Sequence, residues 1–450
     1  MALKLFNALG RKWEDFSPLF PPAVGLYTCG PTVYDYPHIG NYRSYLFADI
    51  LKRTLLLNDY KVKHVMNITD VDDKTIKRSQ TDNKSLKDLT EFYTQEFFKD
   101  RETLNILPAD VYPKASDYIE EMVKLIETLI LKDYAYKSED GSVYFSIKKD
   151  EDYGKLAHLN LTTLVDNASG RQKVDEYDKD SAQDFALWKA WHEDDGEVYW
   201  ETALGKGRPG WHIECSAMSM KNLGESFDLH TGGVDNLFPH HENEIAQSES
   251  ATGKQFVKYW LHNEWLLVDG KKMAKSAGNF YTLKNITEKG YSPLSYRYLV
   301  LTAHYRKQLN FTWESLAASQ TALNKLENFI RETKGAGNID QKYADKFKTA
   351  LNEDLNTPQA VAVMWEVIND PSLDPKDKKA TILKLDEALG LKLKEVKSLE
   401  IPAPVMQLLT ERELARKDGN FSLSDQLRDQ VLSLGYIIDD TPTGPKLRQK

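Results

Sequence analysis

The chain has 450 residues, of which 41% are hydrophobic and 28% charged, and a formal net charge of −9. This length predicts two to four packed units, and the composition is that of a soluble globular protein. The acidic balance excludes a chain that is basic throughout, although RNA binding needs only a local positive surface.

The N-terminal part alternates strand-like and helix-like segments. Residues 24–29 form a short β-prone run that ends at Gly30, residues 42–57 carry apolar side chains at helical spacing, and residues 61–68 alternate like a second strand. This order predicts a βαβ unit with a parallel sheet. Because ligands of such sheets bind beyond the carboxyl ends of the strands, we expect the loop of residues 29–41 to carry chemistry.

The rest of the chain becomes helical toward its C-terminus. The predicted segments are, in order, helices over 85–131, a hairpin strand at 142–147, an irregular polar insertion over 148–185, strands and helices from about 198 to 262, and consecutive helices over 312–391. A Pro-containing link at residues 401–404 precedes a last helical hairpin and a basic tail. In that tail, Lys446, Arg448 and Lys450 fit either phosphate contact or a frayed, solvated end.

Targeting segments and disulfides are not expected. The first twenty residues contain no uninterrupted apolar stretch, and no apolar run reaches the roughly 18 residues that a membrane span needs. The only two cysteines, Cys29 and Cys215, are too few for a disulfide framework and indicate a reducing compartment. We therefore expect a cytoplasmic protein without a membrane segment.

A first motif, His38-Ile39-Gly40-Asn41, stands in a loop that is followed at once by a helix. A helix N-terminus favours anions through its unpaired backbone N–H groups, and Gly40 would let a nucleotide approach the backbone closely. A histidine at this place can hydrogen-bond phosphate oxygens as negative charge shifts between them. The same four residues also fit an ordinary helix cap, so the motif alone leaves both alternatives open.

A second motif, Lys272-Met273-Ala274-Lys275-Ser276, lies in a loop rich in Lys and Gly. Mobile lysines in such a loop can stabilise the charge that builds on a pyrophosphate leaving group. Taken by itself, the cluster fits a solvated basic turn better.

In this order, the two motifs resemble the paired ATP signatures of class I aminoacyl-tRNA synthetases, which are usually written HIGH and KMSKS. The chain differs from each signature at one position, with Asn41 in place of the final His and Ala274 in place of the central Ser. Asn41 still offers a donor and an acceptor, and both lysines remain, so neither change removes the implied function. Longer stretches look like those of cysteinyl-tRNA synthetases, namely residues 27–35, 67–74, 210–218 and 238–248, and the resemblance covers essentially the whole chain.

The resemblance implies one zinc ion per chain, with Cys29, Cys215, His240 and Glu244 as its ligands. Thiolate, imidazole and carboxylate are ordinary zinc donors, and His240 and Glu244 are spaced to share one face of a helix. His241 with Glu244 is a competing pair that spacing does not exclude, and the resemblance favours His240. Two buried free cysteines, or one disulfide, are the alternatives to a metal site.

A metal would explain how cysteine is distinguished from serine. Packing alone rejects a near-isostere poorly, whereas sulfur is the much better zinc ligand at neutral pH. No editing domain is then expected.

The resemblance also implies binding roles for other residues. Trp211 and His230 would line the amino-acid pocket, and Thr69 would contact the backbone end of the substrate. Gly40, Gly233, Asp235 and Lys275 would bind ATP, which enters with Mg²⁺. At Asp70, Asp72 and Asp73 a magnesium site is an alternative to the polar start of a helix, and we favour the helix start.

The implied reaction activates L-cysteine with ATP to cysteinyl-adenylate and then transfers the cysteinyl group to the 3′ end of tRNA(Cys). His38, Asn41, Lys272 and Lys275 would stabilise the charge in flight. A ligase that joins activated cysteine to an amino sugar is the nearest rival. The C-terminal part argues against it, because residues 411–417 and 425–429 resemble the tRNA-binding end of a synthetase. A non-catalytic RNA-binding paralogue is the second rival, and the intact motifs argue against it.

The implied fold class is α/β: a Rossmann-like catalytic domain whose parallel sheet is split by an insertion, then an all-α helical bundle and a small C-terminal anticodon-binding domain. The predicted boundaries are 1–118 for the first half of the catalytic domain, 119–200 for the insertion, 201–262 for the second half, 263–311 for the stem-contact region with the lysine loop, 312–400 for the bundle and 401–450 for the C-terminal domain. A monomer is expected, as is usual in this family.

Overall fold

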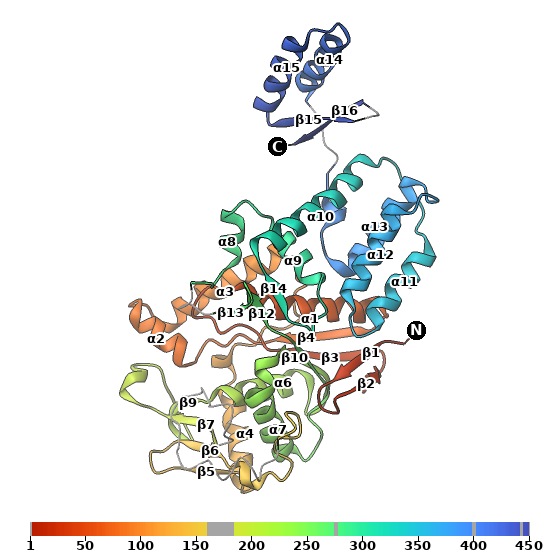
Figure 1. Cartoon of the computed structure of the whole chain (residues 1–450). Coiled ribbons are helices and arrows are strands. Elements are labelled where there is room, and N and C mark those ends of the chain that lie inside the picture. Colours follow the sequence, from red (N-terminus) through yellow and green to blue (C-terminus); the bar gives the residue numbers. More distant parts are fainter. Residues whose placement is uncertain (1, 160–183, 274–277, 398–401, 442–443, 450) are drawn as a thin grey trace. The chain divides into compact units, whose positions relative to one another are not determined.

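The computed structural model describes residues 2–159, 184–273, 278–397, 402–441 and 444–449 (Figure 1). The chain divides into two compact units, one formed by residues 1–326 and 336–393 and the other by residues 327–335 and 394–450. The finer segment boundaries given above stay predictions. No helix of the described residues is both long and apolar enough to cross a membrane.

The first unit is built around a parallel sheet of four strands, in the order β11, β10, β3, β4. Their bounds are Val257–Asn263 for β11, Phe227–Gly233 for β10, Ala23–Thr28 for β3 and Lys61–Met66 for β4. Helix α1, Ile39–Leu57, connects β3 to β4 and completes the predicted βαβ unit. The predicted parallel sheet is confirmed.

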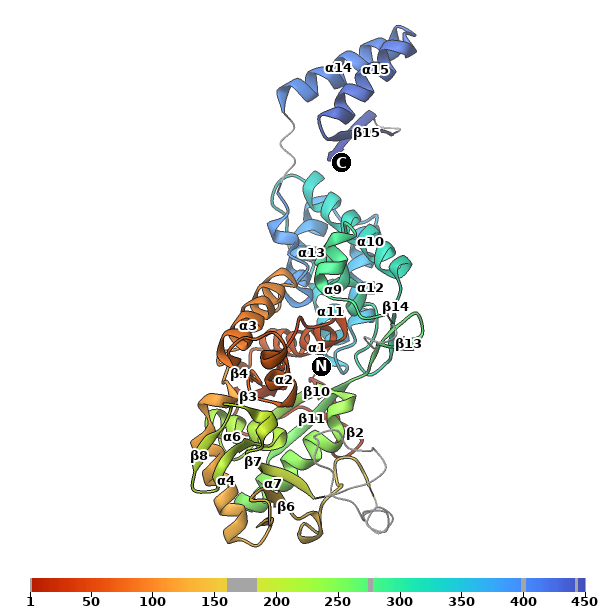
Figure 2. The same ribbon diagram turned by 90° about the vertical axis from the view of Figure 1, so that its left-hand side faces the viewer.

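Helices cover both faces of this sheet, and each face has its own apolar core. On one side lie α1 and α3 (Leu86–Thr103), and on the other α4 (Ile119–Leu131), α6 (Trp211–Leu223) and α7 (Glu242–Thr252) (Figures 1 and 2). Helix α2 (Asp73–Thr81) contributes Ile76 to the core on the side of α4. Tyr42 and Phe97 belong to the first core, whereas Met122, Met218 and Ile245 belong to the second. Burial on both faces is what a parallel sheet requires.

The insertion between β4 and β10 carries an antiparallel sheet in the order β5, β6, β7, β9, β8. Its strands are β5 (Ala135–Lys137), β6 (Val143–Phe145), β7 (Phe185–Ala190), β8 (Trp200–Thr202) and β9 (Gly205–Pro209). The sequence placed the return of strands at about residue 198, but β7 begins earlier. Phe185, Leu187 and Trp188 are fully buried there, although the surrounding sequence is polar. Most of the predicted irregular segment, residues 160–183, lies outside the described residues.

Helices follow the sheet in the chain, and three of them, α9, α11 and α13, pack against α1. They are α8 (Leu283–Glu288), α9 (Pro293–Leu301), α10 (Trp313–Glu332), α11 (Gln341–Asn352), α12 (Thr357–Asn369) and α13 (Pro375–Leu389). A small sheet precedes and interrupts them, with strands β12 (Leu266–Val268), β13 (Lys271–Lys272) and β14 (Leu309–Phe311). The chain begins with a hairpin that the sequence did not predict, β1 (Lys4–Asn7) and β2 (Lys12–Asp15).

A buried ion-pair network joins α1 to these helices. The Asp49 carboxylate on α1 accepts from Arg53 Nε at 2.8 Å and from Arg297 Nη2 on α9 at 2.5 Å. Arg297 also donates through Nε to the carbonyl of Leu389, the last residue of α13, at 2.6 Å. Asp49 and Arg297 are both buried, so removing either one would leave the other as an uncompensated charge inside the protein.

The second unit contains a helical hairpin and a two-stranded sheet. Its elements are α14 (Ala403–Lys417), α15 (Phe421–Ser433), β15 (Tyr436–Thr441) and β16 (Gly444–Gln449), around a core of Val405, Leu409, Val431 and Ile438. The predicted helical hairpin is confirmed. The predicted tail is instead strand β16, which pairs antiparallel with β15, because Tyr436, Ile438 and Leu447 pack into the core of this unit.

Candidate functional site

The sheet opens at the carboxyl ends of its strands into a cavity of about 390 Å³. Of the residues singled out in the sequence, those that line it are Cys29, His38, Gly40, Asn41, Thr69, Trp211, Cys215, Gly233, Asp235, His240 and Lys272. His230 and Glu244 are not among its lining residues, and Lys275 lies outside the described residues. Segments that are up to 243 residues apart therefore meet at one cavity, at the place where a parallel sheet binds ligands.

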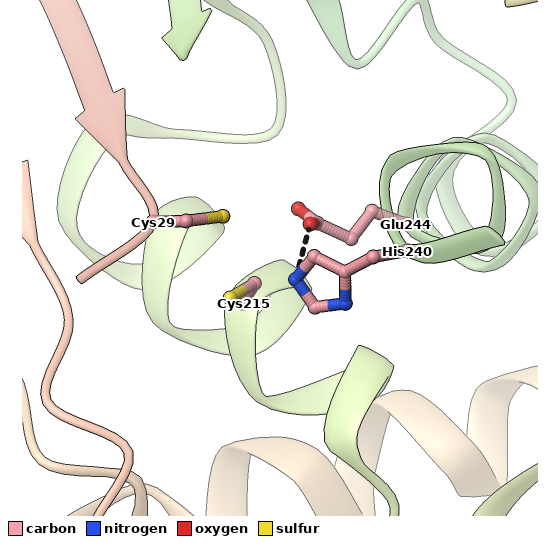
Figure 3. Close-up of side chains that lie close together, drawn as sticks. All are labelled: Cys29, Cys215, His240 and Glu244. Atoms are coloured by element: carbon pink, nitrogen blue, oxygen red, sulfur yellow. Dashed lines mark ion pairs between the residues drawn. The ribbon is translucent and has the colours of Figure 1, made fainter. Parts of the chain in front are cut away.

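Four candidate metal ligands converge beside this cavity (Figure 3), and three of them, Cys29, Cys215 and His240, line it. Cys29 directly follows β3, Cys215 lies on α6, His240 lies in the short turn of Leu237–His241, and Glu244 lies on α7. One ligand atom from each lies within 4.8 Å of all the others, and His240 Nε2 is 3.0 Å from Glu244 Oε1. The two cysteines are not joined by a disulfide.

A second set of four residues also meets the same distance limit: Cys29, His230, His241 and Glu244. His241 Nε2 is 3.3 Å from Cys29 Sγ, and its Nδ1 is 2.8 Å from His262 Nε2. The second set leaves out Cys215 and so has only one thiol, and only Cys29 of its members lines the cavity. A metal that must also meet a substrate needs an open position, so the geometry favours the set with Cys215 and His240.

The donor set fits a zinc ion. Two thiols, an imidazole and a carboxylate match the usual zinc donors, and the Glu244 carboxylate is fully buried, with Oε1 3.0 Å from His240 Nε2. Burial alone would raise the pKa of Glu244, but His230 and His240 beside it lower that pKa to about 2. The hydrogen bond to Cys29, together with burial, raises the pKa of the Cys215 thiol. A bound cation would favour the thiolate instead.

Two further histidines support the candidate ligands. His212 Nδ1 lies 2.9 Å from His240 Nδ1, and His230 Nε2 lies 2.9 Å from Glu244 Oε2. The structure therefore places His230, which the resemblance assigned to the amino-acid pocket, behind the carboxylate of Glu244, where it is fully buried. The indole of Trp211 stacks on the ring of His240, with ring centroids 4.0 Å apart, and both residues line the cavity. Metal-binding histidines and carboxylates commonly have such outer partners.

His38 and Asn41 form a capping box at the start of α1. His38 Nδ1 accepts from Asn41 N at 3.1 Å, and His38 N donates to Asn41 Oδ1 at 3.0 Å. These two residues therefore cap α1, and the cap lies in the cavity wall with the N-terminus of the helix, so the predicted role in ATP binding stays a prediction. The backbone of Ile39 also donates to the carbonyl of Tyr281 at 2.8 Å, so the His38 loop is joined to the chain that follows the lysine motif.

Trp265 contacts both Asp235 and Lys272, which the resemblance assigns to ATP, and it was missed in the sequence. Its Nε1 donates to Asp235 Oδ1 at 3.3 Å, and Lys272 Nζ lies 4.6 Å above its ring. Gly233 and Asp235 stand at the carboxyl end of β10. Single tryptophans carry no periodic signal, so only the fold could show this contact.

The three aspartates near residue 72 have structural partners. Asp72 caps α2 by accepting from Lys74 N at 2.6 Å and from Thr75 N at 3.2 Å. Asp70 accepts from the backbone and hydroxyl of Ser116, and Asp73 pairs with Lys189 at 2.9 Å. The preferred prediction of a helix start is confirmed.

Comparison with known proteins defines the class first. Residues 15–321 match the family model of the tRNA synthetases class I (C) catalytic domain, and residues 346–394 match the DALR domain. Among solved structures, the fold is similar to that of Mycobacterium tuberculosis methionyl-tRNA synthetase in complex with methionyl-adenylate. That match has a TM-score of 0.57 and 15% identity, and it covers 82% of this chain and 90% of that one. The fold is therefore that of a class I tRNA synthetase.

Curated relatives then define the family. The chain is 50% identical to the cysteine–tRNA ligase of Chlamydia felis (strain Fe/C-56) over 99% of this chain and 98% of that protein. It is 46% identical to the cysteine–tRNA ligase of Brachyspira hyodysenteriae (strain ATCC 49526 / WA1) over 99% of both. The chain belongs to the cysteine–tRNA ligase family, as its motifs predicted.

Proposed function

We propose that the chain activates L-cysteine with ATP and transfers the cysteinyl group to the 3′ end of tRNA(Cys), with a zinc ion selecting the substrate thiol. The observation that carries this proposal is the convergence of Cys29, Cys215, His240 and Glu244, of which the first three line one cavity. His38 and Lys272, from the two ATP motifs, line the same cavity. Family membership supports the overall reaction, and the donor set supports the metal.

Zinc in this site would supply a soft Lewis acid that binds a thiolate far better than a hydroxyl group. The residues of the chain hold and shape that position. His212 and His230 fix the directions of His240 and Glu244, and the ring of Trp211 closes one side of the space above His240. Thr69 lines the cavity, and we assign to it the contact with the backbone end of the amino acid.

In the first step, an oxygen of the cysteine carboxylate attacks the α-phosphorus of ATP, which enters with Mg²⁺. A bond forms between that oxygen and the α-phosphorus, the bond from the α-phosphorus to the bridging oxygen breaks, and pyrophosphate leaves with both bonding electrons. On one side of the cavity, His38 and the N-terminus of α1 would stabilise the negative charge on the phosphate oxygens. Asn41 holds this end of the helix through its capping hydrogen bonds with His38. Lys272 and Lys275 would do so on the other side, and Gly233 and Asp235 would hold the ribose.

Gly40 would keep this side open to the nucleotide. A Cβ at this position would lie 2.5 Å from the methyl group of Met273 and 2.9 Å from His38 Nδ1, closer than side chains pack. In the second step, the terminal 2′-hydroxyl of tRNA takes the cysteinyl group and releases AMP. We assign anticodon binding to the C-terminal unit, and we expect a cytoplasmic monomer with two reduced cysteines.

An ATP–pyrophosphate exchange assay with cysteine tests the proposal, followed by charging of tRNA(Cys) and by metal analysis of the purified protein. We expect exchange with cysteine but not with serine, charging of tRNA(Cys), and one zinc per chain. Exchange without charging would favour the amino-sugar ligase, and absence of exchange would favour the RNA-binding paralogue. Full activity in a protein that contains no zinc would contradict the role of the metal.

A further inference from the structure

A segment of the insertion, residues 150–157, lies against the start of α7, directly after His240 and His241. The carboxylate of Glu242, the first residue of α7, is 1% exposed. It accepts three backbone hydrogen bonds from this segment: Oε1 from Gly154 N at 2.9 Å, and Oε2 from Leu156 N at 3.0 Å and Ala157 N at 2.7 Å. Backbone N–H groups can only donate, so the carboxylate is the acceptor in all three.

Two further contacts join the segment 150–157 to α7. The hydroxyl of Tyr153 donates to Asn243 Oδ1 at 2.6 Å, and both residues are buried. Farther along α7, Lys155 forms an ion pair with Glu249 near the surface. The first turn of α7 is therefore held by the insertion through buried hydrogen bonds, and a partly buried ion pair holds the helix farther along.

This turn is the part of the chain that sets the positions of two proposed metal ligands. Glu242 stands between His240 and Glu244, and it does not line the cavity. Metal and substrate sites work when their ligands are held within about half an ångström of the productive geometry. Hydrogen bonds to a buried carboxylate are among the stronger ones in proteins, so they can hold a turn of helix to this precision.

We propose that Glu242 is a positioning residue. It couples the insertion segment 150–157 to the turn that carries His240 and Glu244, and thereby sets metal affinity and cysteine recognition. This inference rests on the proposed function. It gives the insertion a role in substrate selection, although no residue of the segment 150–157 lines the cavity.

Glu242→Gln is the direct test, because glutamine keeps the size of the side chain but turns an NH₂ group toward backbone donors. We expect zinc affinity, measured by competition with a chromogenic chelator, to fall about 10–100-fold, as for other partners of metal ligands. The KM for cysteine in pyrophosphate exchange should rise, whereas the KM for ATP should stay near that of the wild type. Tyr153→Phe, a milder change, should shift the same two quantities in the same direction.

Lys155→Met is the matched control, since it removes the surface ion pair between the same segment and the same helix but leaves the carboxylate of Glu242 with its three donors. Zinc affinity and both KM values should be unchanged in this variant. The inference is overturned if Glu242→Gln behaves like Lys155→Met, or if the KM values for ATP and cysteine rise equally. If Glu242→Gln does not fold, an unchanged zinc affinity in Tyr153→Phe overturns it. A wild-type protein that binds no zinc would instead overturn the metal part of the proposed function.

Discussion

At the scale of single residues, Cys215 is the sharpest test of the proposed metal site. It is 1% exposed, faces Cys29, and belongs only to the set of ligands that is open to the cavity. We expect Cys215→Ser to lose zinc and to activate cysteine poorly, because a hydroxyl group does not ionise to replace the thiolate at neutral pH. The loss of zinc affinity should exceed the roughly 10–100-fold typical of an outer partner. Metal analysis and pyrophosphate exchange measure the two effects.

The control for Cys215→Ser is Ser219→Ala, which changes a buried side chain one turn farther along α6. This variant should keep both zinc and cysteine activation, and the KM for ATP should change little in either protein. Full zinc content and full selectivity against serine in Cys215→Ser would show that Cys215 is not a ligand.

His212 gives a second prediction at this scale. Its Nδ1 lies 2.9 Å from His240 Nδ1, the ring nitrogen that points away from Glu244. In His212→Phe the aromatic volume remains but this hydrogen bond is lost, so the ring of His240 is no longer fixed. We expect zinc affinity to fall about 10–100-fold, with the KM for ATP unchanged. Chelator competition measures the affinity, and an unaltered value would mean that the contact does not orient His240.

Residue chemistry explains which parts of the site could be predicted. The thiols, His240 and Glu244 lie in long motifs, so resemblance could name them before any geometry was known. Spacing left His240 and His241 undecided, because both stand within reach of Glu244. The roles of His212, Glu242 and Trp265 depend on distances between segments far apart in the chain, and no local pattern carries that information.

At the scale of elements, the start of α6 shows how closely the insertion and the catalytic sheet are packed. Gly210 caps α6, and a Cβ there would lie 2.0 Å from the carbonyl oxygen of Ala186 in β7. We expect Gly210→Ala to destabilise the protein by about 1–3 kcal/mol, because backbone must move to admit the methyl group. It should also raise the KM for cysteine, since Trp211 and Cys215 move with the helix. Thermal unfolding and exchange kinetics measure both effects.

Gly10→Ala is the matched control, because the added Cβ would meet only the flexible side chain of Lys12, at 3.1 Å, and the carboxylate of Glu14, at 3.5 Å. Its stability and its KM for cysteine should be close to those of the wild type. Equal stability of the two variants would mean that β7 can yield at Ala186 without cost.

Elements with a regular pattern were predictable, and those that depend on tertiary contacts were not. The βαβ unit of β3, α1 and β4 follows from apolar spacing that changes from strand-like to helix-like. Strand β7 was missed because its apolar residues lie in a polar stretch, and β1 and β16 were missed because short hairpins gain most of their stability from packing. Each of these strands forms because of the residues it packs against, and its own sequence does not reveal them.

At the scale of the whole molecule, the network of Asp49, Arg53 and Arg297 joins the catalytic sheet to the helices that follow it. Arg297→Met would remove one partner of a buried carboxylate and the hydrogen bond to the carbonyl of Leu389. We expect a loss of about 3–5 kcal/mol in the free energy of unfolding, measured with urea. Arg78→Met, which removes a more exposed ion pair with Asp82, should cost at most about 1 kcal/mol. If the two variants lose similar amounts of unfolding free energy, the buried network does not stabilise the first unit more than an exposed ion pair does.

The division into two units leads to the last prediction. The core of α14, α15 and the hairpin β15–β16 comes from its own residues, Val405, Leu409, Val431 and Ile438, whereas all the described residues proposed for catalysis lie in the first unit. A chain that lacks residues 398–450 should therefore retain pyrophosphate exchange with cysteine and bound zinc, but should charge tRNA(Cys) poorly, because the region assigned to anticodon binding is missing. The full chain serves as the control in both assays. Unimpaired charging would remove the tRNA role from the second unit, and loss of exchange would show that the first unit needs the second one to work.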